Sequence, residues 1–340
     1  MKYCRQPFST VSINNNGNVN SCMCGAWTTL GTVGNLLVSD LSGIWKDLPM
    51  QKLRQTIFDQ SFQYCKKTEC GEFWSLPDAD AITDPTYSLP RELNVAADSN
   101  CNLSCGICRN ELQYDKEANP TAVKILNTLK IAYSDFKHNV DIYCDGSGDI
   151  FASTAWKEFF LSEDLPDCFT FILQTNGNLL TKNTRILEKL KSRINCLIVS
   201  FDAASDETYK KTRGGKFELV KEGVRQAVAL GIDVTTQYVL QRENYHEVNQ
   251  YVSLCKELGV THIGLQLIDR WPHMSDQYWK HNRIQDNTDV DINKLTQDLN
   301  KLRWDIQIGL CGGIMNLLDN NGIDITPVEF RNGQPITFYK

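Results

Sequence analysis

The sequence predicts an α/β fold with a mostly parallel sheet. From residue 92 onward, short apolar stretches typical of strands alternate with stretches of helical periodicity, and this alternation is the pattern of βαβ units. Six units are recognised up to about residue 270, fewer than the eight of a closed (β/α)8 barrel. Five of the 13 cysteines lie ahead of these units. A chain of 340 residues with this division is expected to form one large domain and a smaller one.

The smaller domain is expected over residues 1–75. Residues 11–13 and 18–20 flank a turn at Gly17, which predicts a β-hairpin. Apolar residues recur with helical spacing over residues 41–57 but are interrupted by Pro49, so two short helices are expected there. Cys65 and Cys70 are expected on a loop. Residues 76–91 contain three prolines and no periodicity, and they are predicted to be a linker.

The elements of the large domain come next in the chain. Strands are expected at residues 92–97, 140–144, 169–174, 196–201, 233–240 and 262–267, and helices at 121–133, 217–230 and 244–258. The last of these helices begins at Asn244, a plausible N-cap. Residues 271–288 are rich in Trp, His and Asp and resemble a loop that lines a pocket. A helix over 291–302 and the remaining residues form an extension, 271–340, that closes or caps the barrel.

Composition limits the classes of function. The hydrophobic fraction of 41% and charged fraction of 22% are typical of a soluble globular protein. A formal net charge of −6 without a basic patch argues against nucleic acid or an anionic membrane as partner, and no apolar run is long enough to span a bilayer. The first fifteen residues lack the shape of a secretion signal, so a cytoplasmic location is expected. The chain has 13 cysteines, which is an odd number. In a reducing compartment such a count indicates metal or redox chemistry rather than disulfides.

The densest group of thiols is Cys101, Cys105 and Cys108. Gly106 among them favours a turning loop over a straight helix. Thiolates suit iron–sulfur clusters and zinc. Four cysteines would complete a structural site, whereas three leave one metal position open for another ligand. On spacing alone, a zinc knuckle or three unrelated buried thiols remain alternatives.

This C-x3-C-x2-C spacing, with βα units after it, resembles the radical S-adenosylmethionine (radical SAM) superfamily over about residues 92–270. The resemblance implies a partial (β/α)6 barrel and a [4Fe-4S] cluster bound by Cys101, Cys105 and Cys108. In the family, SAM binds the open iron, and its reductive cleavage gives methionine and a 5′-deoxyadenosyl radical that abstracts hydrogen from a substrate. An electron donor such as flavodoxin or ferredoxin is implied as a partner.

The resemblance also implies SAM-binding residues at the carboxyl ends of the strands, where ligands bind in barrel-like folds. A Gly-Ser-Gly-Asp segment after the second strand replaces the Gly-Gly-Glu-Pro with which the family holds the SAM amino group, so a backbone role is expected there. Ser200, Asp202 and Arg213 are expected to bind the methionyl carboxylate or the ribose. Ile107 stands where relatives often place an aromatic residue near adenine. The expected SAM-binding residues are Ile107, Gly146, Ser147, Gly148, Asp149, Asn176, Ser200, Asp202 and Arg213.

Residues 1–75 resemble the SPASM/twitch type of auxiliary-cluster domain. The matching features are Cys4, a G-x4-C element that ends at Cys22, the pairs Ile44-Trp45 and Leu53-Arg54, and the closing Cys65 and Cys70. In relatives this domain usually comes after the barrel and holds two clusters, whereas here it precedes the barrel and has thiols for one. The expected ligands of one auxiliary cluster, [4Fe-4S] in type, are Cys4, Cys22, Cys65 and Cys70, with Cys24 as an alternative to Cys22. A zinc ribbon with similar ligands is the other interpretation.

The type of reaction depends on the fate of the substrate radical after hydrogen abstraction. If the auxiliary cluster accepts the substrate electron, the outcome is a dehydrogenation or a crosslink. If a thiol returns a hydrogen atom, the outcome is an epimerisation, and Cys144 at the predicted barrel mouth is the candidate donor. The substrate is expected to be a small molecule or a peptide. The alternative function is a non-catalytic iron–sulfur or zinc protein in electron transfer or partner binding.

Overall fold

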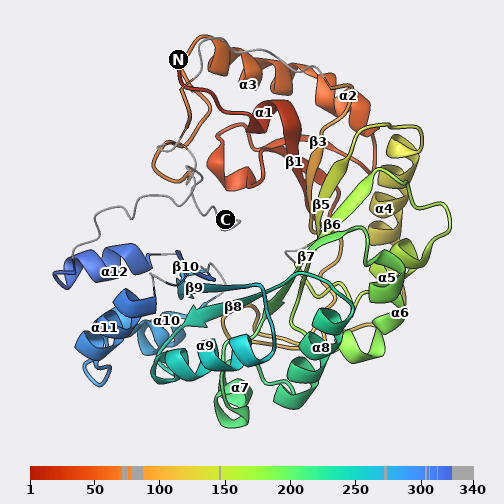
Figure 1. Ribbon diagram of the computed structural model, residues 1–340. Helices are drawn as coiled ribbons and strands as arrows, with labels where there is room; N and C mark the ends of the chain where they lie inside the picture. The colour runs from red at the N-terminus through yellow and green to blue at the C-terminus, as the bar shows by residue number, and fades with distance from the viewer. Residues whose placement is uncertain are drawn as a thin grey trace. The chain divides into compact units, whose positions relative to one another are not determined.

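The protein consists of two compact units that are interleaved along the chain. The computed structural model describes residues 1–70, 73, 76–78, 87–144, 147–271, 274–302, 305, 307–311 and 313–323. Unit 1 comprises Met1–Asn100, Tyr114–Gln174 and Ser192–Asn195, and unit 2 comprises Cys101–Gln113, Thr175–Lys191 and Cys196–Lys340. The elements of both are labelled in Figure 1.

The sheet of unit 1 joins the N-terminal hairpin to the first barrel strands. Its order is β3-β2-β1-β4-β5-β6, with strands β1 (Thr10–Ile13), β2 (Asn18–Ser21), β3 (Thr32–Asn35), β4 (Glu92–Val95), β5 (Val140–Cys144) and β6 (Phe169–Thr175). The predicted hairpin β1–β2 is antiparallel, and Gly17 supplies the left-handed backbone of its turn at a φ of 79°. Strand β1 then pairs in parallel with β4, and β4 pairs in parallel with β5. The cysteine-rich segment is therefore continuous with the βα units through hydrogen-bonded strands.

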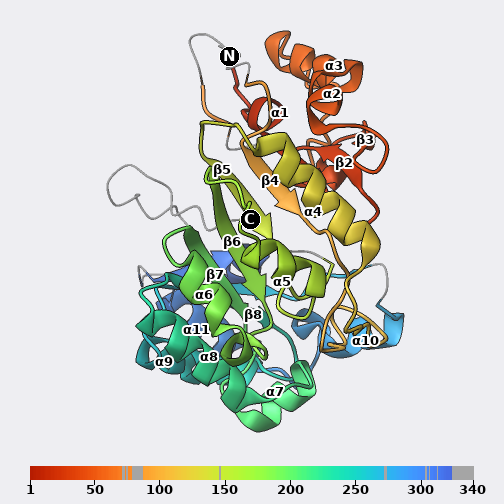
Figure 2. The ribbon, with the colours of Figure 1, turned by 90° about the vertical axis from the view of Figure 1, so that its right-hand side faces the viewer.

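Helices cover this sheet, and side-chain caps begin most of them. They are α1 (Gln6–Ser9), η1 (Gly25–Trp27), α2 (Leu41–Lys46), α3 (Leu48–Phe58), α4 (Pro120–Tyr133) and α5 (Thr154–Leu161). The break between α2 and α3 confirms the prediction from Pro49, which lies in the first turn of α3 where its missing N–H costs no hydrogen bond. Helices α4 and α5 lie side by side in Figure 2, and the stacked rings of Trp156 and Phe160, 5.2 Å apart, face the sheet through Phe171.

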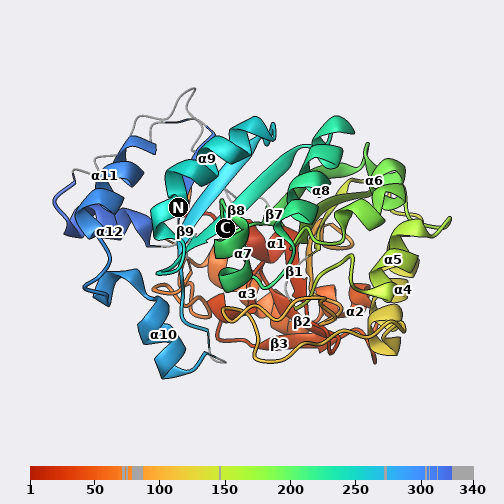
Figure 3. The ribbon, with the colours of Figure 1, turned by 90° about the horizontal axis from the view of Figure 1, so that it is seen from below.

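Unit 2 contains the later parallel strands. They are β7 (Ile194–Ser200), β8 (Val234–Leu240), β9 (His262–Leu267) and β10 (Ile308–Cys311), joined in the order β7-β8-β9-β10. The helices and turns are η3 (Leu180–Lys182), α6 (Thr184–Leu190), α7 (Asp206–Thr212), α8 (Phe217–Ala229), η4 (Tyr245–Glu247), α9 (Val248–Glu257), α10 (Asp276–Asn282), η5 (Ile284–Asp286), α11 (Ile292–Leu302) and α12 (Ile314–Asn320). Figure 3 shows α11 and α12 together beyond β9.

The α/β fold class with parallel strands alternating with helices is confirmed, as expected for a partial (β/α)6 barrel. Two local predictions are wrong. Asn244 does not cap a helix; instead its amide donates to the carbonyls of Asp202 and Val239 and so fastens two strand ends together. The supposed loop at 271–288 contains helix α10, which begins after the capping Ser275. Residues 79–86 of the expected linker and residues 324–340 lie outside the described part of the chain.

In the described part of the chain, no helix combines the length and the apolar character needed to cross a membrane.

Candidate functional site

The cysteine loop of unit 2 turns tightly around its second thiol. The backbone N–H of Cys108 donates to the carbonyl of Cys105 at 2.8 Å, which closes the turn that Gly106 was expected to favour. Cys101 and Cys105 are buried beside Leu103 and Ile107, whereas Cys108 is exposed. Burial raises the pKa of the Cys105 thiol, although the charge of Arg213 opposes this. Two of the three predicted ligands are thus shielded from water and one faces out.

Asn176, in unit 2, lies against the cysteine loop of the same unit. Its side-chain amide donates to Asn102 Oδ1 at 3.0 Å and lies 3.7 Å from the sulfur of Cys101. Asn178 supports it from behind, because its backbone N–H donates to Asn176 Oδ1 and its amide donates to the hydroxyl of Tyr209. Asn102 and Asn178 were not predicted as site residues. The run Thr-Asn-Gly-Asn after a buried strand was the signal that could have pointed to the second.

Asp202 and Arg213 form a buried ion pair at the end of β7. Arg213 Nη2 lies 2.6 Å from Asp202 Oδ2, with 11% and 0% of the respective side chains exposed. Asp202 has a left-handed backbone, φ 56°, and its Oδ1 accepts the backbone N–H of Val239 at 2.7 Å. Such strain in a residue other than glycine persists only where its surroundings over-determine it, and it is concentrated at functional sites.

The charges of this pair are tightly coupled. Burial raises the pKa of the Asp202 carboxyl, against the effect of the adjacent guanidinium. Burial also disfavours the charge on Arg213, but the carboxylate of Asp202 more than offsets this, so the pKa of Arg213 is raised. Removing either partner would leave an unpaired charge in a buried place.

The residues of unit 2 suit the iron–sulfur cluster and the SAM that their sequence pattern implies. Within the described residues, the buried Arg213 Nε has no hydrogen-bond partner, so one strong donor is left for an anionic group such as a carboxylate. The backbone carbonyl of Arg213 lies 3.4 Å from the Cys105 sulfur, which places this arginine next to the cysteine loop. Ser200 is buried at the last position of β7. Three thiols, a buried guanidinium and strand-end polar groups suit a cluster together with an amino-acid ligand.

The Gly-Ser-Gly-Asp segment lies in unit 1, where Gly146 is outside the described residues. Gly148 packs directly on the chain before the cysteine loop, because a Cβ there would stand 2.3 Å from the carbonyl oxygen of Asn100. Asp149 donates its backbone N–H to the same carbonyl at 2.8 Å, and its buried carboxylate accepts from Phe151 N–H. Ser147 is half-buried. These contacts give Gly148 and Asp149 backbone roles in holding Asn100, and their contact with SAM stays a prediction.

Cys144 ends β5 in unit 1 and is fully buried. Its thiol lies 3.7 Å from the carbonyl of Ile142. The described contact is structural, and the hydrogen-donor role stays a prediction.

Four N-terminal thiols of unit 1 are electrostatically coupled. Burial raises the pKa of Cys22 well above its usual value, and Cys4, Cys65 and Cys70 raise it further, so each of these three thiols lies near Cys22. Burial and Cys70 likewise raise the pKa of Cys65 to about 11. In the described residues, no three Cys, His, Asp or Glu side chains meet closely enough to hold a single metal ion.

Cys22 differs from Cys24 in its backbone. Cys22 is buried with a left-handed φ of 68°, whereas Cys24 is half-buried with an extended backbone at the start of η1. Cys24 is also not among the thiols that act on Cys22. Cys22 thus lies with the other three cysteines, and its assignment as a cluster ligand in place of Cys24 stays a prediction.

Comparison with known proteins bears on both thiol groups. The family model of the radical SAM superfamily matches residues 99–255, and that of the SPASM family, an iron–sulfur cluster-binding domain, matches residues 4–71. Residues 99–255 are thus a radical SAM domain, and residues 4–71 are a SPASM domain. A radical SAM domain implies a [4Fe-4S] cluster and SAM as cofactors, and a SPASM domain implies auxiliary iron–sulfur coordination. The predicted cofactors and the predicted position of the auxiliary domain ahead of the barrel are thereby confirmed.

Named relatives of this radical SAM protein are distant. A probable GTP 3′,8-cyclase of Methanococcus aeolicus is 26% identical over 225 residues, which are 62% of this chain and 67% of the relative. Streptococcus suis SuiB bound to the precursor peptide SuiA aligns at a TM-score of 0.48 with 14% identity, covering 80% of this chain and 64% of SuiB. The enzyme anSMEcpe with bound AdoMet aligns at 0.46 with 17% identity, covering 62% and 59%. The chain thus spans about two thirds or less of the lengths of these proteins.

Proposed function

We propose that this protein is a radical SAM enzyme that reductively cleaves SAM to a 5′-deoxyadenosyl radical and abstracts hydrogen from a small-molecule or peptide substrate. The observation that carries the proposal is the grouping of three thiols, the Asn176 amide and the buried Asp202–Arg213 pair in one unit, next to one another. A pure electron carrier would not need the polar groups at the strand ends. A cluster bound here supplies a low-potential electron and an open iron for SAM.

The protein's own residues would hold and orient the reactants. Cys101, Cys105 and Cys108 would bind the cluster, with Cys101 oriented by the amide of Asn176. Arg213, fixed by Asp202, would direct its free Nε towards the methionyl carboxylate of SAM. Ser200 and the strand-end loops would contact the ribose, and Ile107 would cover adenine. Burial of these groups excludes water, which protects a reactive radical from side reactions.

Cys4, Cys22, Cys65 and Cys70 would hold one auxiliary cluster. Depending on whether that cluster accepts the substrate electron, the outcome is a dehydrogenation, a crosslink or, with Cys144 as hydrogen donor, an epimerisation. Flavodoxin or ferredoxin is the kind of partner that would supply the initial electron.

Anaerobic reconstitution of the full chain with iron and sulfide tests this function. Two [4Fe-4S] clusters predict about eight irons per chain. Reduction with dithionite in the presence of SAM is expected to release 5′-deoxyadenosine and methionine. Tightly bound zinc together with intact SAM would contradict the proposal and favour the non-catalytic alternative.

Substitution of Cys22 is expected to remove one cluster, whereas substitution of Cys24 is not. Cys22→Ser should lower the iron content from about eight to about four per chain, because the auxiliary cluster would lose one of its four thiolates and, unlike the cluster of the cysteine loop, has no SAM to take the open position. Cys24→Ser is the matched control, two residues away, and should keep about eight irons. Iron and sulfide analysis after reconstitution measures both. Loss of four irons from the Cys24 variant alone would reverse the assignment.

A further inference from the structure

A polar pocket of about 420 Å³ lies in unit 1, where the parallel strands β1, β4 and β5 begin. Ligands in parallel α/β sheets usually bind at the opposite, carboxyl ends of the strands. Here the loop with Gly148 comes after the carboxyl end of β5, whereas Asn139 and Asp141 of the pocket lie at its start. The pocket is therefore separate from the Gly148 loop, which is predicted to contact SAM, in the same unit. Its volume is within the range of small-molecule sites.

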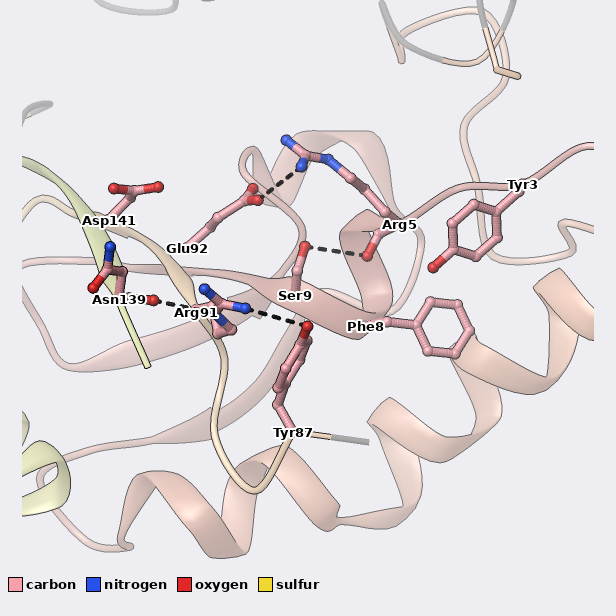
Figure 4. Close-up of a pocket in the computed structure, with 9 residues that line it drawn as sticks. All are labelled: Tyr3, Arg5, Phe8, Ser9, Tyr87, Arg91, Glu92, Asn139 and Asp141. Carbon is pink, nitrogen blue, oxygen red and sulfur yellow. Dashed lines mark hydrogen bonds and ion pairs between the residues drawn. The ribbon is translucent and has the colours of Figure 1, made fainter. Parts of the chain in front are cut away.

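The guanidinium of Arg91 is held in a fixed orientation in this pocket. Its Nε donates to the carbonyl of Asn139 at 3.1 Å, its Nη1 donates to the hydroxyl of Tyr87 at 3.2 Å, and its guanidinium lies 5.0 Å from the centre of the Tyr87 ring. Figure 4 shows these links. Within the described residues, Arg91 forms no ion pair with a carboxylate, and its hydrogen bonds use Nε and Nη1 but not Nη2. Two directions of the guanidinium are thus fixed by the protein while a third is left for a ligand.

Tyr87 adds a second donor at the same place. Because its hydroxyl oxygen accepts from Arg91, its own proton is left to donate, and the structure gives that proton no acceptor in the described residues. The other arginine of the pocket, Arg5, is neutralised by Glu92 at 3.2 Å, and Glu92 also accepts from Thr10. Asp141 is occupied through Oδ1, which accepts from two neighbouring side chains. Arg91 and Tyr87 are therefore the donors available to an anion.

The remaining wall of the pocket is aromatic. The rings of Tyr3 and Phe8 lie 6.0 Å apart, on the side of the pocket away from Asn139 and Asp141 in Figure 4. Phe8 also belongs to the apolar cluster that includes Cys4 and Cys65, and Tyr3 and Arg5 flank Cys4 in the sequence. The pocket thus has a planar guanidinium and a hydroxyl donor on one side and aromatic rings on the other. This arrangement suits a carboxylate that is attached to an apolar or aromatic group.

We propose that this pocket binds an organic carboxylate with an aromatic or apolar group, with its charge on Arg91 and Tyr87 and its body against Phe8 and Tyr3. The same chemistry is offered by a free aryl carboxylate and by the C-terminal residue of a peptide. The pocket favours a carboxylate over a phosphate dianion, because one guanidinium is available and two carboxylates, Glu92 and Asp141, also line the pocket and would repel a second negative charge. The site is independent of SAM cleavage, so it stands or falls separately from the proposed enzymatic function.

Isothermal titration of the reconstituted full chain with N-acetyl-L-phenylalanine tests the site. For a ligand of this size we expect a Kd on the order of 1 mM. The uncharged N-acetyl-L-phenylalanine amide should bind at least about tenfold more weakly, because it has no carboxylate to accept charge-assisted hydrogen bonds from the guanidinium. Phenylacetate separates the two sources: equal binding indicates a free carboxylate, and weaker binding indicates a peptide terminus.

Three variants locate the binding. Arg91→Gln should weaken N-acetyl-L-phenylalanine by about tenfold or more, and Tyr87→Phe by about threefold, because each removes a donor. Arg5→Gln is the matched control and should change the Kd by less than about twofold, since Arg5 is already paired. If Arg91→Gln fails to fold, Tyr87→Phe and the amide probe still show whether the carboxylate binds in this pocket. No binding to the wild-type chain, equal binding of acid and amide, or wild-type affinity in Arg91→Gln would each overturn the proposal.

Discussion

Replacing Arg213 by methionine is expected to lower the free energy of unfolding by about 3–5 kcal/mol, because it leaves a buried carboxylate without its counter-ion. Asp202 is fully buried, and its only ion-pair partner among the described residues is Arg213. Its remaining bond, from Val239 N–H, cannot by itself offset the loss of hydration. Urea denaturation of the cluster-free chain measures the effect.

Two further variants show whether the unpaired charge is the cause. Lys211→Met removes a cation of the neighbouring helix that is paired with Glu207 on the surface, and no measurable change is expected. Asp202→Asn combined with Arg213→Met removes both charges and keeps an acceptor for Val239, so the double variant should be more stable than Arg213→Met alone. If Arg213→Met unfolds at the same urea concentration as Lys211→Met, the pair has no structural importance.

The sequence predicted the elements because their signals are local. The alternating pattern of β8 and the periodicity of α4 lie within single stretches, and the turn residue Gly17 identifies its own hairpin. Strand β10 was missed because only four residues, Ile308–Cys311, form it, and a glycine interrupts their apolar run. The three predicted cluster ligands, Cys101, Cys105 and Cys108, were likewise proposed from their short spacing.

The partners of the site residues could not be predicted, because they depend on contacts between distant segments. Asp202 and Arg213 were both expected to bind SAM, but their ion pair with each other arises only when helix α7 folds back on the end of β7. The sequence likewise left Cys22 and Cys24 as alternatives, because their spacing does not show which of the two lies near Cys65 and Cys70. Tyr278, in a segment expected to be a loop, reaches the cysteine loop only in the folded unit.

Tyr278 and Gly106 are expected to show strong energetic coupling. A Cβ at Gly106 would stand 2.7 Å from Cε2 of Tyr278 and 3.0 Å from its hydroxyl oxygen, so the phenol ring packs where a side chain would project. The backbone of Gly106 is not left-handed, and alanine is therefore opposed by the ring alone. Burial first, and then the charges of Cys105 and Asp202, raise the pKa of Tyr278 to about 12, as expected for a half-buried phenol beside the cysteine loop.

A double-mutant cycle measures the coupling. Gly106→Ala should lower the free energy of unfolding by about 1–2 kcal/mol in the wild-type chain, the usual cost of overpacking, but by less than about 0.5 kcal/mol in Tyr278→Ala, where the space is vacant. Gly264→Ala is the matched control, because a Cβ there meets its nearest atom at an ordinary 3.7 Å. An equal cost of Gly106→Ala in both backgrounds would mean that Tyr278 does not hold the loop. A cost that disappears with the ring would show that α10, from beyond β9, fixes the turn that carries Cys105 and Cys108, two of the three predicted cluster ligands.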